Sequence, residues 1–257
     1  MYDLPGSLEV EAAGAVRVLR LNRPEQRNAI DPELRAALTA VWTRIADDEG
    51  ARAVLLTGRG SDFSVGGDIG NLVRNREDHE HRRRTLRAVH SLLEALIGFH
   101  LPVVAAVNGP AVGIGCNLAL LSDAVVMAES AYFADTHVAA GLVAGDGGPA
   151  FWPLLVGLLR AKDLVLFGEP ISAARAAEIG LATRVVADGR VEEEGLALAA
   201  RAAELPPAAV QDTKRAFNLH LRRVMGEVGY FASAAESESF LTPELGASLA
   251  RRLNWPS

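Results

Sequence analysis

The sequence predicts an α/β protein with a mostly parallel sheet, and three observations support this prediction. Apolar segments typical of strands alternate with segments of helical periodicity through the first half of the chain. The segment 102–107, PVVAAV, is apolar at every position, as expected for a strand that is buried on both faces. The chain has 257 residues, 49% of them hydrophobic and 23% charged, which is enough for a substantial core.

The first half of the chain supplies the predicted sheet and its crossover helices. Asp31 is a good N-cap, and Pro32 suits the first position of the helix that follows it. A long helix is predicted over about 79–99, and another helix begins near Gly113. Strands are predicted at 16–21, 52–57, 102–107 and 124–128. This alternation favours right-handed β–α–β connections.

Helical segments dominate the second half. Residues 151–168 have a helical pattern, and residues 171–186 have that of a helix ended by Gly180 and followed by a strand. From Val191 onward every segment has a helical pattern. We therefore expect a core over residues 1–190 and a helical region over 191–257 that packs on the core or on a partner subunit.

Composition excludes several classes of function. A net charge of −6 and a pI of about 5.6 argue against a nucleic-acid-binding surface. The single cysteine, Cys116, permits no disulfide within the chain and suits a reducing compartment. The first residues lack the pattern of a signal peptide, and the longest apolar runs are too short to span a membrane. We expect a cytoplasmic protein with no nucleic-acid or membrane partner, and the histidine spacing suggests no metal site.

Two strands end in glycine-rich turns, FSVGGDI (63–69) and NGPAVGIGCNLAL (108–120). A helix that begins near Gly113 leaves its first N–H groups, including that of Ile114, without partners inside the helix. Gly67 lets a ligand approach the backbone closely. Two such amides directed at one carbonyl oxygen would form an oxyanion hole. Alternatively, each turn is a structural link between a strand and a helix; a dinucleotide site is less favoured, because GPAVGIG lacks the G-x-G-x-x-G spacing.

Four segments in order, NRPEQRNAID, FSVGGDI, VAAVNGPAVGIGCNLAL and ISAARAAEIGLATRVV, resemble the crotonase superfamily of enoyl-CoA hydratase/isomerase enzymes. The resemblance runs from about Val16 to Val186. It implies a spiral of ββα units with a helical C-terminal trimerisation region, assembled as a homotrimer or as a hexamer that is a dimer of trimers. It also implies that the Gly67 and Ile114 amides hold the thioester oxygen of an acyl-CoA substrate, with coenzyme A as part of the substrate and no further cofactor.

The same resemblance implies the residues that surround the CoA ester. Arg27 matches a basic residue near the phosphates, and Arg251 falls where the family often has a lysine that reaches a neighbouring subunit's CoA. The other implied substrate-binding residues are Ala29, Ser64, Val65, Gly67, Asp68, Ile69, Gly113 and Ile114.

The chain departs from the family at the two catalytic glutamates of the hydratases, where it has Asn117 and His137. Asparagine cannot act as a base at neutral pH, whereas histidine, with an ordinary pKa of about 6.5, can. Asp146, in GLVAGDGG, is a candidate replacement that could move a proton, although an aspartate between glycines is also typical of a turn. Asp135 could hydrogen-bond to His137, and Cys116 is more typical of a small buried hydrophobic residue than of a nucleophile.

We therefore expect an enzyme that acts on an enoyl-CoA thioester through an enolate stabilised by Gly67 and Ile114. The missing glutamate pair favours isomerase-like or atypical hydratase chemistry, with Asp146, His137 and Asn117 as the candidate catalytic side chains. Two alternatives stay open: an acyl-CoA-binding homologue without catalysis, and a CoA-thioester hydrolase or decarboxylase. The walls of the acyl pocket are expected from about residues 71–88 and from the C-terminal helices.

Overall fold

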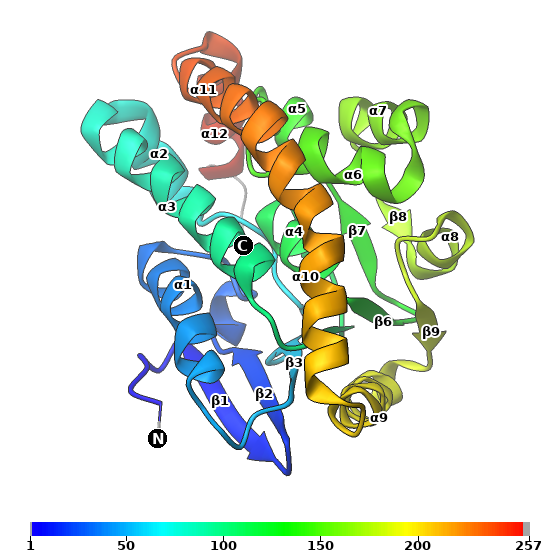
Figure 1. The fold of residues 1–257 in the computed structure, drawn as a ribbon. Helices are drawn as coiled ribbons and strands as arrows, with labels where there is room; N and C mark the ends of the chain where they lie inside the picture. The colour runs from blue at the N-terminus through cyan, green and yellow to red at the C-terminus, as the bar shows by residue number, and fades with distance from the viewer. Residues whose placement is uncertain (1, 254–257) are drawn as a thin grey trace.

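A six-stranded sheet forms the centre of the molecule in the computed structural model, which describes residues 2–253 of the chain (Figure 1). The strand order is β1–β2–β3–β4–β6–β9, with β1 antiparallel to β2 and all other neighbours parallel. The strands are β1 (Leu8–Ala13), β2 (Val16–Leu21), β3 (Ala53–Gly58), β4 (Val103–Val107), β6 (Ala124–Ala128) and β9 (Arg184–Val186). The predicted α/β class with a mostly parallel sheet is confirmed.

The central strands are buried along their length, which explains the continuous apolar sequence of β4 and the mostly apolar one of β3, whereas β2 buries two arginines, Arg17 and Arg20. β2 and β4 are buried at every position, and β3 is buried up to its last residue, Gly58. In register, Val18 lies beside Leu55, and Leu55 lies beside Val104. The sequence did not predict β1, because this edge strand has exposed glutamates and little apolar alternation.

A second, three-stranded sheet has the order β5–β7–β8. Its strands are β5 (Ala111–Val112), β7 (Tyr132–Ala134) and β8 (Ile171–Ser172). They have two or three residues each, too few for a pattern of alternation, and the sequence analysis missed them. Isolated bridges join Ser64 to Ala111 and Ile30 to Gly67, so the loop after β3 is held between this small sheet and the chain before the first helix.

Helices cover both sheets (Figure 1). They are α1 (Pro32–Ala46), α2 (Ile69–Glu77), α3 (His79–Gly98), α4 (Ile114–Leu120), α5 (His137–Ala140), α6 (Gly148–Val156), α7 (Leu158–Phe167), α8 (Ala173–Ile179), α9 (Val191–Ala203), α10 (Pro207–Val224), α11 (Tyr230–Ser239) and α12 (Pro243–Leu253), with short turns η1 (Pro24–Gln26), η2 (Asp188–Arg190) and η3 (Met225–Gly229). As predicted, Asp31 caps α1 and accepts a hydrogen bond from the Leu34 N–H at 2.8 Å. The stretch 151–168 is helical as predicted, but it forms two helices, because Gly157, with φ of +80°, separates α6 from α7.

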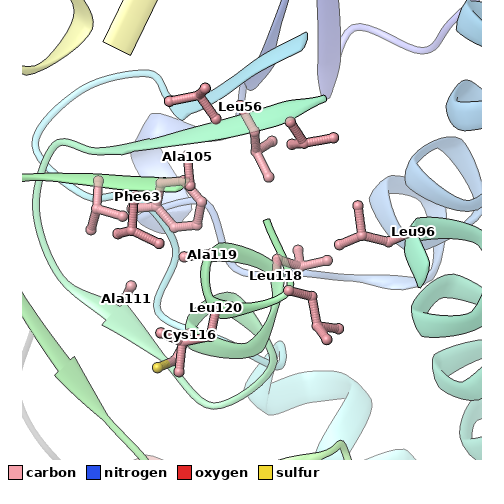
Figure 2. Close-up of a cluster of buried hydrophobic side chains, with 14 of the residues drawn as sticks. Leu56, Phe63, Leu96, Ala105, Ala111, Cys116, Leu118, Ala119 and Leu120 are labelled. Carbon is pink, nitrogen blue, oxygen red and sulfur yellow. The ribbon is translucent and has the colours of Figure 1, made fainter. Parts of the chain in front are cut away.

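The core is centred on α4, which is buried at every position. Figure 2 shows Cys116, Leu118, Ala119 and Leu120 of this helix in one cluster with Phe63 from the first glycine turn and Ala105 from β4. Burial in this core raises the pKa of the Cys116 thiol well above its ordinary value. Cys116 is thus a packed hydrophobic residue whose thiol stays protonated, which argues against a nucleophilic role.

The C-terminal helices pack against the rest of the chain. α9 packs against β2, β3, β4 and β6, and Gly195 permits this approach, because a Cβ there would lie 2.8 Å from Leu55 Cδ1. α10 runs along α3 (Figure 1). α12 and Phe240, the residue that follows α11, contribute to a second hydrophobic cluster, made of Leu86, Leu142, Phe240, Leu245 and Leu249. The domain boundary at residue 190 stays a prediction, but packing within the chain continues beyond it.

None of the helices within residues 2–253 is both long and apolar enough to cross a lipid bilayer.

Candidate active site

The first glycine turn is held against the second by close backbone contact. Gly66 has φ of +88°, and a Cβ there would lie 2.7 Å from the Val112 carbonyl oxygen. The Ile30 N–H donates to the Gly66 carbonyl at 2.7 Å. Gly67, by contrast, has open space around it, since a Cβ would meet only the Leu72 side chain at 3.8 Å. The structural need for glycine therefore lies at Gly66, and Gly67 leaves room for a ligand.

The second glycine turn starts α4. Gly113 has φ of +54°, and its N–H donates to the Ala134 carbonyl at 2.9 Å. Ile114 is the first residue of α4, so its N–H has no acceptor within the helix. Within residues 2–253, the Gly67 and Ile114 N–H groups have no hydrogen-bond acceptor. Both amides belong to the wall of one cavity, as the oxyanion-hole prediction requires.

This cavity has a volume of about 100 Å³. Typical pockets for small molecules have volumes of roughly 300–1,000 Å³, so it suits the reacting part of an acyl group rather than a whole CoA ester. Its polar lining residues are Arg35, Asn71, Asn75, Thr85, Thr136, His137, Asp146 and Glu236. The apolar ones include Ile30, Leu72, Leu86, Val89, Leu142 and Phe240. The expected wall from residues 71–88 and from a C-terminal helix is present.

His137 lies between two buried carboxylates. Its Nδ1 is 2.7 Å from Asp135 Oδ1, and its Nε2 is 3.3 Å from Asp146 Oδ2. The Asp135 carboxylate also accepts a hydrogen bond from the His137 N–H at 3.1 Å. A Cβ on Gly113 would lie 3.4 Å from His137 Cε1 and 3.7 Å from Asp146 Oδ2. The imidazole and the Asp146 carboxylate are therefore next to the residue that precedes the Ile114 amide.

Burial and mutual charge set the protonation of this group. Burial alone would lower the pKa of His137, but the Asp146 and Asp135 carboxylates outweigh it and raise that pKa to about 10. Burial raises the pKa of Asp146 to about 6, against the opposing charge of His137. Burial also acts to raise the pKa of Asp135, but His137 lowers it overall. At neutral pH the imidazole is thus positively charged, and Asp146 is the group able to accept a proton.

Glu236 is a cavity residue that the sequence analysis missed. It is 6% exposed and lies on α11. Its Oε2 would be 2.2 Å from a Cβ on Gly145, so the glycine next to Asp146 makes room for this carboxyl group. Burial, reinforced by Asp146 and Asp135 and opposed by His137, raises the pKa of Glu236 to about 8. A signal was present, because Ala232, Glu236 and Phe240 recur every four residues on one helix face.

Asn117 lies behind Asp146 and does not line the cavity. Its Nδ2 donates to the Asp146 backbone carbonyl and to Asp146 Oδ1, both at 3.0 Å. Its Oδ1 accepts a hydrogen bond from Trp152 Nε1 at 2.9 Å. Asn117 thus fixes the Asp146 side chain and is 1% exposed, which suits a positioning residue.

We expect Asn117→Ala to destabilise the protein. It leaves the buried Trp152 N–H and Asp146 Oδ1 without partners, which costs about 1–3 kcal/mol for each group. Urea denaturation measures the free energy of unfolding. Ser122→Ala, which removes a half-buried hydroxyl that donates to the Leu118 carbonyl of α4, is the control and should cost far less. Equal stability of Asn117→Ala and the unmodified protein would contradict this assignment.

The predicted substrate-binding residues fall into different environments. Val65, Gly67, Gly113 and Ile114 line the cavity, whereas Ser64 is fully buried and its Oγ donates to the Asn28 carbonyl at 2.8 Å. Asp68 caps α2 by accepting from the Asn71 N–H. Arg27 is exposed and pairs with Asp62 at 2.7 Å. Ala29 is buried, Ile69 is partly exposed, and Arg251 is exposed on α12.

Asp135, His137 and Asp146 also offer three possible ligand atoms within 4.8 Å of one another. Both ring nitrogens of His137 already face carboxylates, so neither directs a free lone pair toward a cation. Metal binding would require the loss of one of these contacts. The arrangement therefore suits a shared proton better than a metal ion.

Comparison with known proteins agrees with this geometry. The family model for enoyl-CoA hydratase/isomerase matches residues 11–244. A probable enoyl-CoA hydratase of Rhodobacter capsulatus is 36% identical over 91% of this chain and 95% of its own length. The 2,3-dehydroadipyl-CoA hydratase of Escherichia coli is 34% identical over 88% of this chain and 86% of its own length. The crystal structure of an enoyl-CoA hydratase/isomerase from Mycobacterium paratuberculosis superposes with a TM-score of 0.93, at 45% identity, over 97% of this chain and all of that one. The chain belongs to the enoyl-CoA hydratase/isomerase family, and its fold is that of the crotonase superfamily.

Proposed function

We propose that the protein binds an enoyl-CoA thioester and moves a proton along its acyl chain through an enolate. The observation that carries this proposal is the single cavity that gathers the Gly67 and Ile114 amides with the Asp146 carboxylate. The amides supply two donors for the thioester oxygen, and Asp146 supplies a base beside the reacting carbons. Asn117, which occupies a hydratase glutamate position by resemblance, faces away from this cavity.

The proton shift needs no group beyond those in the cavity. The Asp146 carboxylate removes a proton from carbon 2 of a 3-enoyl-CoA, and the electron pair of that bond moves toward the thioester oxygen. The Gly67 and Ile114 N–H groups stabilise the resulting negative charge, an effect worth about 3–4 kcal/mol per donor in a comparable site. The carboxyl group then returns the proton to carbon 4, which gives the 2-enoyl-CoA. His137, positively charged between Asp135 and Asp146, orients the base.

Glu236 is available as a second proton carrier. Because the pKa of Glu236 is raised to about 8, its carboxyl group is mostly protonated at neutral pH, whereas the Asp146 group is mostly ionised. Hydration also needs two groups, one that activates water and one that delivers a proton to carbon 2. An atypical hydratase could therefore use Asp146 and Glu236 where the usual glutamate pair is missing.

The remaining parts of the proposal concern binding and assembly. We propose that Arg27 lies near the CoA phosphates and that Arg251 reaches the CoA of a neighbouring subunit in a cytoplasmic homotrimer or hexamer. The exposed hydrophobic side chains of α7, which include Leu159 and Phe167, are consistent with a covered surface. The name of the Escherichia coli relative refers to an acyl group with a second carboxylate, so such esters belong in any substrate panel.

Isotope exchange in deuterated water tests the proposed reaction. The protein is incubated with a 3-enoyl-CoA and with crotonyl-CoA, while absorbance reports conjugation and mass spectrometry reports deuterium. We expect conversion of the 3-enoyl ester with deuterium incorporated into the acyl chain. Conversion of crotonyl-CoA to a hydroxyacyl ester would instead favour the atypical hydratase, and release of free CoA would favour thioester hydrolysis or decarboxylation. Binding of CoA esters without exchange or turnover across a broad panel would favour the non-catalytic homologue and overturn the proposal.

A further inference from the structure

Arg35 is a buried charge without a partner in the candidate acyl cavity. It lies in the first turns of α1, is 7% exposed and lines the cavity. Among residues 2–253, no carboxylate oxygen lies within 4.0 Å of its guanidinium, and no acceptor takes a hydrogen bond from it. Burying an unpaired charge is costly, and arginine remains protonated at any ordinary pH. Within the described residues, the chain therefore holds a cation in the cavity wall with which no side chain pairs directly.

The nearest acidic residue is already engaged. Asp31 attracts Arg35 at a distance, but its carboxylate pairs with Arg23 at 3.1 Å and caps α1 through the Leu34 N–H. His81, on α3, is the other titratable group that interacts with the Arg35 charge. Neither side chain can hydrogen-bond to the Arg35 guanidinium without losing a contact that it already makes: Asp31 with Arg23 and the Leu34 N–H, and His81 with Asn71.

The wall around Arg35 carries further polar groups. Asn71 and Asn75 of α2 and Thr85 of α3 line the same cavity. Asn75 Oδ1 is buried, with no hydrogen-bond partner among the side chains and backbone that the structure describes. Asn75 Oδ1 can only accept a hydrogen bond, so it does not select a carboxylate. The guanidinium does, because an alkyl chain would leave that cation without a partner.

We infer that Arg35 binds a carboxylate carried by the acyl group, so that the substrates are CoA monothioesters of dicarboxylic acids. This inference rests on the proposed function and names its substrate class. A guanidinium fits a carboxylate through two parallel hydrogen bonds, and the pairing neutralises the buried charge. His137, Asp146 and the Ile114 amide belong to the loop and helices after β5, whereas Arg35 belongs to α1. The thioester end and the carboxylate end thus meet groups from different parts of the fold.

Ligand binding by calorimetry tests this inference without turnover. Saturated esters are used in chain-matched pairs: succinyl-, glutaryl- and adipyl-CoA against butanoyl-, pentanoyl- and hexanoyl-CoA. We expect at least one dicarboxylic ester to bind about tenfold or more tightly than its matched partner, in line with a hydrogen bond to a charged group. Arg35→Met should remove this preference and leave the affinity for the hydrocarbon esters within about threefold, because it removes only the cation.

Two further variants separate charge from fold. Arg35→Lys, which keeps the charge but loses the paired hydrogen bonds, should retain part of the preference. Arg44→Met removes an exposed arginine of the same helix and should bind every ester as the unmodified protein does. In the absence of ligand, the melting temperature of Arg35→Met should be unchanged or higher, because a buried unpaired charge has been removed.

The outcomes that overturn the inference are distinct from those that overturn the proposed function. Equal affinity for the matched esters, or an equal loss for both in Arg35→Met, would show that Arg35 recognises no acyl carboxylate. Loss of affinity for free CoA in Arg35→Met would assign the guanidinium to the CoA phosphates and overturn the inference as well. Failure of all esters to bind would overturn the proposed function together with the inference that rests on it.

Discussion

Asp146→Asn should abolish deuterium exchange into the acyl chain of a bound CoA ester, with a loss of about 10²–10⁴-fold in rate. The substitution keeps the size of the side chain, and the new amide oxygen can still accept the hydrogen bond from Asn117 Nδ2. Among the residues that the structure describes, it removes the one carboxylate that both lines the cavity and is ionised with a pKa near neutrality, about 6. Exchange is measured by mass spectrometry at pH 7, with calorimetry of a saturated ester to show that binding survives.

Two companion variants decide which group is the base. His137→Gln tests the imidazole directly, and Asp135→Asn tests it indirectly, because Asp135 contacts His137 but does not line the cavity. We expect both to reduce exchange less than Asp146→Asn does. Undiminished exchange in Asp146→Asn together with its loss in His137→Gln would transfer the role of base to His137. Exchange that survives in both variants would remove the proton shift from this cavity altogether.

The pH dependence of the exchange rate should also identify Asp146 as the base. The exchange rate of the unmodified protein should rise as pH increases through about 6, because Asp146 must be ionised to accept a proton. His137, with a pKa of about 10, keeps its charge over this range and contributes no step there. Exchange rates measured from pH 5 to pH 8, at a saturating concentration of the ester, test this rise.

Sequence patterns predicted the parts of the fold that are governed by local physics. Strands β2, β3, β4 and β6 were expected within one residue or so of their ends: β2 because its residues alternate, and the others because burial on both faces leaves a largely apolar sequence. The Asp31–Pro32 start of α1 was expected because capping depends on adjacent residues. The break at Gly157 and the short strands β5, β7 and β8 depend on tertiary contacts, and their sequences alone carry little information.

Some residues of the candidate site could likewise be predicted from local sequence motifs, and others could not. Gly67, Ile114, His137 and Asp146 lie in motifs that the sequence displays, and the structure places all four around one cavity. Glu236 and Arg35 come from helices far from those motifs. Arg35 resembles an ordinary surface charge in the sequence, and Glu236 is marked only by its place between Ala232 and Phe240 on one helix face. Only the packing of α11 and α1 against the cavity shows that these two side chains are buried. The convergence of the two turns on one cavity was thus predictable, whereas the polarity of the cavity wall was not.

Glu236→Gln should stabilise the protein in alkaline solution. The Glu236 carboxyl group, buried beside Asp146 and Asp135, has a pKa of about 8 in the folded chain against an ordinary value of 4.5. Between these two pH values the folded state binds more protons than the unfolded state, so the free energy of unfolding decreases as pH rises. Each unit of pKa difference corresponds to about 1.4 kcal/mol, so the loss by pH 9 should be on the order of several kcal/mol. The neutral glutamine avoids this loss and fills the same volume.

Urea denaturation at pH 5 and at pH 9 measures this effect as a difference between variants. His137 also loses stabilisation as pH rises, because its folded pKa of about 10 exceeds the ordinary 6.5, but this contribution is present with or without Glu236. Glu238→Gln is the matched control, since Glu238 lies on the exposed face of the same helix. We expect Glu236→Gln to gain stability over the unmodified protein at pH 9 and to match it near pH 5, while Glu238→Gln gains nothing at either pH. If Glu236→Gln showed the same decline between pH 5 and pH 9 as the unmodified protein, Glu236 would be ionised within the fold, and it could not serve as the proton donor opposite Asp146.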